Sequence, residues 1–231
     1  MELLSNFING DYVNPKSNNY LDVFEPATGQ VYCQVPNSNG DDIHPAVNSA
    51  IHAFPVWSSL SLDERSLYLK TIAEMIESRL DEFAKYESRD TGKPISLARS
   101  VDIPRAVSNF RFSAEYASHF EFEFNINNDS SHNTVIRSPL GPVGCISPWN
   151  LPLYLFTWKI APALITGNTV VAKPSELTPF TAFKFGEICK DAGLPAGVLN
   201  IIHGQGLTAG DALISHSGIK AISFTGGTAT G

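Results

Sequence analysis

Hydrophobic and polar positions follow two different rhythms along the 231-residue chain. The first 57 residues begin with short apolar pieces broken by turn signals, such as Phe7-Ile8 before Asn9-Gly10, and such pieces indicate short strands. Further strands are expected at residues 20–24 and 31–35. A helix is then expected from Asp41-Asp42 through Ala46, Val47, Ala50 and Ile51.

Two longer helices are expected between residues 61 and 117. Ser61 and Glu64 fit a capping box, in which each side chain satisfies the other residue's free backbone N–H. Apolar residues then recur at three- and four-residue steps, which predicts one helix closed by Gly92 and Pro94. This apolar stripe consists of Leu69, Ile72, Ile76, Leu80 and Phe83. The next helix, from about residue 97 to 117, is expected to place Val101, Ala106 and Phe110 on its apolar side.

Residues 119–139 interrupt this pattern. Positions 125–133 are dense in Asn, Asp and Ser, and the strand-like Thr134-Val135-Ile136 follows them. Two interpretations stay open: a solvated surface hairpin, or an arm that pairs with another subunit.

From residue 140 onward, strand and helix patterns alternate. Strands are expected at 143–147, 169–172, 198–202 and 221–224, and helices at 153–163, 180–192 and 208–215. This alternation predicts parallel strands joined by crossover helices, and therefore an α/β fold with a doubly wound, Rossmann-like sheet.

Composition narrows the class of protein. Apolar residues make up 43% and charged residues 17%, which is ordinary for a globular protein, and the net charge of −7 argues against nucleic-acid or anionic-membrane partners. The most apolar stretch, 151–166, is too short to span a bilayer, and no secretory signal is visible. Cys33, Cys145 and Cys189 are widely spaced, which favours reduced thiols of a cytoplasmic protein over a metal site.

A polar or glycine-rich loop follows each of the four strands, where parallel sheets bind ligands. The loops are Pro148-Trp149-Asn150, Lys173-Pro174-Ser175-Glu176, residues 204–210 and residues 225–231. Each loop also has a purely structural interpretation: Trp149 in the core, Lys173 and Glu176 as a surface ion pair, and the glycines as turn formers. The spacing from Gly206 to Gly210 does not match the usual dinucleotide-binding motif.

The combination of these loops is more informative than any one of them. Lys173 and Glu176 offer a cation and an acceptor to the hydroxyls of a ribose. Gly226-Gly227, before an expected new helix, allow backbone N–H groups to approach a pyrophosphate. Asn150 offers an amide donor beside an aromatic side chain, as an oxyanion site would. Together the loops indicate a nucleotide next to a carbonyl group.

The chain resembles aldehyde dehydrogenases, from Phe7-Ile8-Asn9-Gly10 onward. The motifs are Gly141-Pro142-Val143-Gly144, Pro148-Trp149-Asn150-Leu151-Pro152, Trp158-Lys159, Ala161-Pro162-Ala163-Leu164, Gly167-Asn168-Thr169, Lys173-Pro174-Ser175-Glu176, Gly193-Leu194-Pro195, Gly197-Val198 and Phe224-Thr225-Gly226. Within the family, Asp102-Ile103-Pro104-Arg105, Asn109-Phe110-Arg111-Phe112 and residues 147–154 are most similar to the 2-aminomuconic and 2-hydroxymuconic semialdehyde branch.

The resemblance implies NAD as cofactor, an aldehyde as substrate and a role for each matching residue. Asn150 would place its amide on the alkoxide that forms when a thiolate attacks the aldehyde. The cofactor would contact Ile146, Ser147, Pro148, Trp149, Lys173, Ser175, Glu176, Gly206, Gly210, Phe224, Gly226 and Gly227. Leu151, Tyr154 and Trp158 would wall the aldehyde tunnel. Arg105 would face its entrance, unless it is an ordinary surface or ion-paired arginine. Gly227 stands where the family often has Ser, so one hydroxyl contact to phosphate would be lost.

The resemblance also implies an organisation in three parts. Residues 1–118 would be the N-terminal part of the cofactor-binding domain, 119–139 an oligomerisation arm, and 140–231 the Rossmann-like NAD-binding part. A homo-oligomer, dimer or tetramer, is the expected state of the full-length protein.

The family's general base, a Glu in an ELGG-type motif, and its later nucleophilic Cys match no residue of this sequence. Three interpretations stay open: part of a genuine aldehyde dehydrogenase, a non-catalytic module that at most binds nucleotide or a partner subunit, or an unrelated nucleotide-binding α/β protein. The last would require several motifs to agree by chance. We expect residues 1–231 alone to be inactive, to bind NAD weakly and to aggregate.

Overall fold

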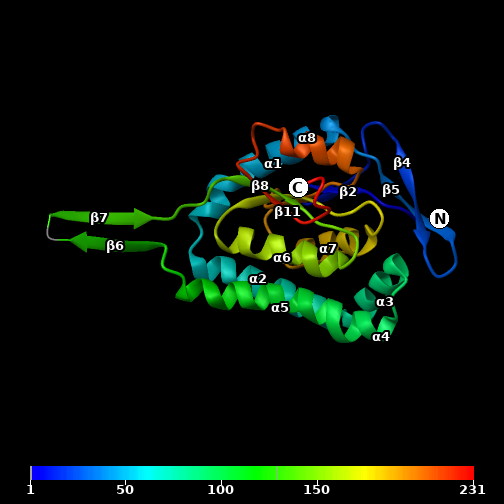
Figure 1. Ribbon diagram of the computed structural model, residues 1–231, viewed down its shortest axis with the longest axis horizontal. Helices are drawn as coiled ribbons and strands as arrows, with labels where there is room; N and C mark the ends of the chain where they lie inside the picture. The colour runs from blue at the N-terminus through cyan, green and yellow to red at the C-terminus, as the bar shows by residue number, and fades with distance from the viewer. Residues whose placement is uncertain (1, 129) are drawn as a thin grey trace.

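The computed structural model describes residues 2–128 and 130–231, and it centres on a six-stranded sheet of order β11-β8-β9-β10-β2-β3 (Figure 1). Its parallel strands are β8 (Pro142–Ile146), β9 (Thr169–Lys173), β10 (Leu199–Ile201) and β11 (Ala221–Phe224). The sheet is extended by two antiparallel strands from the N-terminus, β2 (Asn6–Ile8) and β3 (Asp11–Val13). The expected doubly wound α/β sheet is therefore confirmed.

Helices cover both faces of this sheet (Figure 1). One face carries α1 (Gly40–Ser59) and α8 (Asp211–Ile214), and the other carries α6 (Pro152–Ile165) and α7 (Phe180–Asp191). Val170 packs into the core on the α6 side and its neighbour Val171 into the core beneath α1. Strand β9 is buried on both faces, which is why its sequence is an apolar run rather than an alternation.

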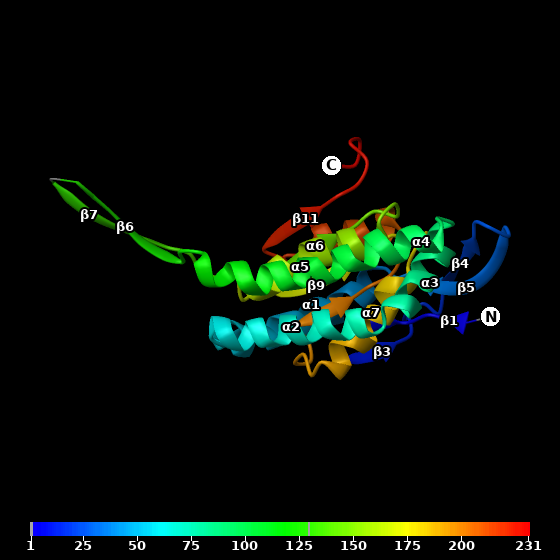
Figure 2. The ribbon, with the colours of Figure 1, turned by 90° about the horizontal axis from the view of Figure 1, so that it is seen from below.

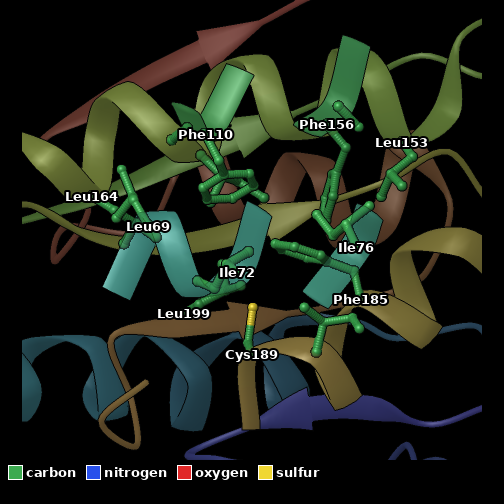
Figure 3. Packing of buried hydrophobic residues seen from close by; sticks show 14 of the residues in the cluster. Leu69, Ile72, Ile76, Phe110, Leu153, Phe156, Leu164, Phe185, Cys189 and Leu199 are labelled. Atoms are coloured by element: carbon green, nitrogen blue, oxygen red, sulfur yellow. The ribbon is translucent and has the colours of Figure 1, made fainter. Parts of the chain in front are cut away.

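A further helical layer, α2 (Leu62–Ser78) and α5 (Ile103–Tyr116), packs outside α6 (Figure 2). Phe110 of α5, Phe156 of α6 and Phe185 of α7 meet in the larger core, where the ring of Phe185 contacts the other two (Figure 3). The capping box at the start of α2 is confirmed: the Ser61 N–H donates to Glu64 Oε2 at 2.7 Å, and the Glu64 N–H donates to Ser61 Oγ at 3.2 Å.

The prediction of a single helix over residues 61–91 is wrong, because α2 ends before Arg79 and a second helix, α3 (Leu80–Thr91), follows. Arg79 leaves the helical conformation (φ −107°, ψ 22°), and its guanidinium pairs with Glu82 at 2.7 Å and with Glu187 at 3.3 Å. Ile76 and Phe83 stay fully buried on either side of the break. The apolar period therefore continues across the break and does not reveal it.

The helix expected from residue 97 is also interrupted. It consists of α4 (Ile95–Leu97), a π-helical turn (Ala98–Asp102) and then α5. Val101, expected on the apolar side, is 40% exposed, so this expectation is wrong. Asp102 instead lies four residues before the buried Ala106, on the same side of the helix, and is buried. The helix expected at 208–215 likewise begins as a π-turn (Gly206–Gly210) before α8.

Two small sheets flank this body. Strands β1 (Glu2–Leu3), β5 (Gln30–Pro36) and β4 (Tyr20–Glu25) form one of them, which confirms the strands expected at 20–24 and 31–35. After a 3-10 turn (Ala117–His119), β6 (Glu123–Asn128) and β7 (Ser131–Ile136) form a largely exposed hairpin that projects from the body (Figures 1 and 2). Within the described residues, no helix combines the length and apolarity needed to cross a membrane.

Candidate functional site

The loops expected to bind ligand follow strands that end at the same edge of the sheet. Ile146 of β8 pairs with Lys173 of β9 on one side and with Phe224 of β11 on the other. Backbone hydrogen bonds continue beyond these ends, from Ser147 N to Lys173 O and from Thr225 N to Ile146 O, both at 3.1 Å. The structure therefore brings the loops after β8, β9 and β11 together.

Lys173 and Glu176 form an ion pair with an Nζ–Oε2 distance of 3.2 Å, and Lys173 Nζ also donates to Pro174 O at 3.0 Å. The Lys173 side chain is 3% exposed and the Glu176 side chain 30% exposed, so an ordinary surface ion pair is excluded. Burial lowers the pKa of Lys173, and the Glu176 carboxylate opposes this shift. Ser175 is buried, and its hydroxyl accepts a hydrogen bond from Leu177 N at 3.2 Å.

The glycines of the site differ in their surroundings. Gly210 lies against the Lys173 side chain, since a methyl group added there would be 3.7 Å from Lys173 Cδ. At Gly206 and Gly227 an added methyl group would meet no atom within 4 Å. At Gly226 it would collide with the partly exposed Phe224 ring, which would then have to move aside.

The loop after β8 presents polar and aromatic groups. Trp149 is 58% exposed, so its interpretation as a core residue is wrong, and its carbonyl accepts from Thr178 Oγ1 at 3.3 Å. The buried hydroxyl of Ser147 has no hydrogen-bond partner in the part of the chain that the structure describes. Ile146 and Pro148, on either side of Ser147, are half-buried.

Asn150 is exposed and follows Trp149, two residues before α6 begins. Its backbone carbonyl accepts a hydrogen bond from Lys93 Nζ at 3.3 Å. Among the described residues, no group bonds to its side-chain amide, which is therefore available to a ligand. Leu151, the residue after it, is half-buried and occupies the N-cap position of α6 without a capping hydrogen bond from its side chain.

The expected substrate residues lie on two packed helices. Tyr154 and Trp158 are one turn apart on α6, with ring centroids 5.4 Å apart, and Trp158 is 53% exposed. The exposed Arg105 of α5 places its guanidinium 6.0 Å from the Tyr154 ring centroid. It forms no salt bridge within residues 2–128 and 130–231, so the interpretation of Arg105 as an ion-paired arginine is excluded. The alternative to a role in substrate binding is then an ordinary surface arginine.

The sequence interpretation missed several polar residues at or behind the site. Lys159 is buried in α6 and donates to Thr225 Oγ1, and burial lowers its pKa. His203, after β10, is buried with both ring nitrogens lacking a partner among the described residues. Burial, with a smaller effect of Lys173, lowers its pKa to about 3. Asn109 of α5 donates to Tyr154 O and to Thr157 Oγ1, both at 2.9 Å. Lys159 gave a signal as a charge inside an apolar helix pattern and Asn109 as part of a branch motif, whereas nothing in the local sequence marked His203.

The three cysteines share apolar, enclosed surroundings. Cys33, Cys145 and Cys189 are free and buried. Burial raises the pKa of Cys33 and of Cys145 to about 12 and raises that of Cys189 well above its ordinary value. In the described ranges, no group of three or more His, Cys, Asp or Glu side chains is placed to hold a metal ion.

A doubly wound sheet with ribose- and anion-binding groups at its strand ends is typical of dinucleotide-binding proteins. The model of the aldehyde dehydrogenase family matches residues 12–231, and the chain belongs to this family. This confirms the resemblance found in the sequence motifs.

Three relatives illustrate the similarity. The chain is 50% identical to the 2-aminomuconic semialdehyde dehydrogenase of Homo sapiens over 229 residues, which cover 99% of this chain and 47% of that enzyme. It is 42% identical to the 5-carboxymethyl-2-hydroxymuconate semialdehyde dehydrogenase of Escherichia coli, covering 100% and 49%. The NAD+ complex of a Bacillus cereus aldehyde dehydrogenase superposes with a TM-score of 0.95 at 36% identity, covering 100% and 47%. The chain thus spans about half the length of these relatives.

Proposed function

We propose that the chain forms the cofactor- and aldehyde-binding half of an NAD-dependent aldehyde dehydrogenase whose substrate is a semialdehyde with a carboxylate. The observation that carries this proposal is the position of Asn150. It follows the strand whose end pairs with Lys173, and it precedes the helix that bears Tyr154 and Trp158. Its amide, which bonds to no group among the described residues, therefore belongs to the segment that links the nucleotide loops to the aromatic surface.

The strand-end residues fit NAD. The buried Ser147 hydroxyl lacks a hydrogen-bond partner among the described residues. At Gly206 and Gly227 no atom lies within 4 Å of the position that a Cβ would take, so a ligand can approach the backbone there. In this proposal Lys173 and Glu176 bind the adenosine ribose, and the backbone N–H groups near Gly226 and Gly227 approach the pyrophosphate. The similarity to an aldehyde dehydrogenase solved with NAD+ supports this assignment. When bound, NAD supplies the hydride acceptor.

Asn150 would donate its amide to the oxygen of the aldehyde as negative charge develops there. The reaction also requires a thiolate and a general base. The raised pKa values of the three buried thiols argue against each of them as that nucleophile. We therefore propose that the 231-residue chain alone does not oxidise aldehydes.

Arg105 would select the substrate by binding its carboxylate. A guanidinium offers two parallel hydrogen bonds to a carboxylate, and Arg105 is exposed beside Tyr154 without a competing acidic partner among the described residues. The names of the human and Escherichia coli relatives, both dehydrogenases of acidic semialdehydes, support this substrate class.

The remaining assignments concern organisation. We propose that residues 119–139, which contain the exposed β6–β7 hairpin, form an arm between subunits of a homo-oligomer, and that 1–118 and 140–231 form the cofactor-binding domain. The three free cysteines support a reducing compartment such as the cytoplasm.

The alternative function, a non-catalytic nucleotide-binding or subunit-binding module, is favoured by the absence of a usable thiolate among the described cysteines.

The test is a fusion enzyme that joins residues 1–231 to the carboxy-terminal half of the human relative. It should form NADH with an acidic semialdehyde, and Asn150→Ala should lower kcat about 100-fold or more while KM for NAD changes little. The unmodified human enzyme is the positive control. A folded fusion enzyme that binds NAD but oxidises no aldehyde would support the non-catalytic alternative.

A further inference from the structure

Behind Asn150 lies a nearly buried ion pair that the proposed chemistry does not use. Lys93 Nζ is 2.6 Å from Asp102 Oδ2, and the two side chains are 13% and 2% exposed. Lys93 follows Gly92, whose left-handed conformation (φ 73°) ends α3, and Asp102 is the last residue of the π-turn. Buried ion pairs contribute little net stability compared with apolar residues of similar size. Stability alone is therefore a weak explanation for this pair.

The ion pair is connected to the loop after β8. Lys93 Nζ donates to the backbone carbonyl of Asn150 at 3.3 Å, across 57 positions of sequence. The direction of this carbonyl fixes the peptide plane that follows Asn150. The Asn150 side chain is attached to the Cα next to this carbonyl, so fixing the peptide plane restricts the directions in which the side-chain amide can point.

A second side chain holds the same segment from its other end. Glu87 of α3 is fully buried, and its Oε2 accepts a hydrogen bond from Leu153 N, in the first turn of α6, at 3.4 Å. Its other oxygen has no partner within the described residues. Burial raises the pKa of Glu87 to about 8, and Lys93 opposes this shift. Residues 150–153 are thus bonded at both ends to side chains from the end of α3 and the loop after it.

Asp102 reaches this position from the buried side of its helical segment. It lies four residues before the buried Ala106, whereas Val101, which the sequence pattern placed on the apolar side, is 40% exposed. Short π-turns are uncommon and are frequently found at functional sites. Here the irregular turn ends at a carboxylate that pairs with Lys93, whose ammonium group contacts Asn150.

We propose that Lys93, held by Asp102, is a positioning residue that orients the Asn150 amide, while Glu87 fixes the first turn of α6. The inference rests on the proposed role of Asn150 as the oxyanion donor. It assigns no contact with substrate to Lys93, Asp102 or Glu87.

The test uses the side-chain amide signal of Asn150 in the ¹⁵N-labelled fusion enzyme, free of cofactor and aldehyde, and assigns it by its loss in Asn150→Asp. Lys93→Met and Asp102→Asn should shift this signal and raise hydrogen exchange at the Leu153 amide about tenfold. Lys93→Arg, which keeps the cation, should restore the native signal. Arg99→Met is the matched control, because Arg99 pairs with Asp81 at 2.7 Å in the same helical segment but is exposed.

An unchanged Asn150 signal in folded Lys93→Met, or the same change in Arg99→Met, would overturn the proposal. Asp102→Asn keeps the shape of the side chain, so it decides the question if Lys93→Met does not fold. A native Asn150 signal in that variant also overturns it.

These measurements require neither cofactor nor aldehyde, so they fail independently of the proposed function. A displaced Asn150 amide in Lys93→Met combined with a folded but inactive fusion enzyme refutes only the proposed function. A native signal in Lys93→Met combined with an active fusion enzyme refutes only the positioning role.

Discussion

The Lys173 ammonium group lies 3.2 Å from the Glu176 carboxylate, yet the two groups meet the solvent very differently, at 3% and 30% side-chain exposure. The cation is enclosed by its own loop and by the neighbouring Gly210, and the carboxylate is the end that a ligand can reach. A ribose that binds here would therefore meet an acceptor first.

This relationship predicts that the fusion enzyme prefers NAD to NADP. The Glu176 carboxylate can accept hydrogen bonds from ribose hydroxyls, but it would repel a 2′-phosphate. We expect kcat/KM to be about tenfold or more higher with NAD, and Glu176→Gln to narrow the difference. Glu187→Gln, which removes a carboxylate on α7, is the control and should leave the ratio unchanged. Equal kcat/KM values for the two cofactors in the unmodified fusion would contradict the prediction.

Much of the fold follows from local sequence rules. Neighbouring residues determine both the capping box at Ser61 and the alternation of strands and helices after residue 140, so both could be predicted. The break at Arg79 could not, because the apolar period continues across it and the guanidinium pairs with Glu187, 108 positions away. The π-turn at residues 98–102 was not predictable either, because no residue type in this segment marks it.

Some residues of the candidate site could likewise be predicted from the sequence, and others could not. Its loops were predictable because parallel strands place their carboxyl ends at one edge of the sheet, where Lys173 and Ile146 are indeed paired. The groups behind Asn150 were not predictable. Lys93 and Glu87 reach residues 150 and 153 across 57 and 66 positions, and no local pattern marks such contacts.

A second prediction concerns substrate selection by Arg105. In the fusion enzyme, Arg105→Ala should raise KM for an acidic semialdehyde roughly 10- to 100-fold, because a hydrogen bond to a charged group contributes about 1.5–3 kcal/mol. A neutral aldehyde of similar length should be nearly unaffected. Arg105→Lys should recover only part of the loss, since an ammonium group lacks the planar fork of a guanidinium. Equal effects of Arg105→Ala on both aldehydes would mean that Arg105 is structural.

A third prediction concerns the thiols of the 231-residue chain. Cys33, Cys145 and Cys189 are buried, and their raised pKa values leave almost no thiolate at neutral pH. A thiol reagent should react slowly with the native chain and rapidly with all three cysteines in denaturant. The same chain should form no NADH from NAD and an aldehyde. Rapid labelling of one native cysteine, together with turnover that its replacement by Ser abolishes, would contradict this prediction.

A fourth prediction concerns pH and stability. Burial raises the pKa of Glu87 from its ordinary 4.5 to about 8, so between these values the folded chain retains a proton that the unfolded chain releases. This contribution to stability is fully present below pH 4.5 and is lost as pH rises through 8. Asp90, whose pKa burial raises to about 7, acts in the same direction. His203, whose pKa is lowered to about 3, acts oppositely as pH falls below 6.5.

Comparing Glu87→Gln with the native chain isolates the contribution of Glu87, because Asp90 and His203 are common to both. The free energy of unfolding of Glu87→Gln, measured by urea denaturation, should rise relative to that of the native chain between pH 5 and about 8, by at most ~1.4 kcal/mol per pH unit. Glu115→Gln, at an exposed position of α5, is the control and should show a nearly constant difference. A constant difference for Glu87→Gln as well would mean that Glu87 is ionised throughout this range in the folded chain. Its hydrogen bond to Leu153 would then hold the first turn of α6 equally well at every pH in that range.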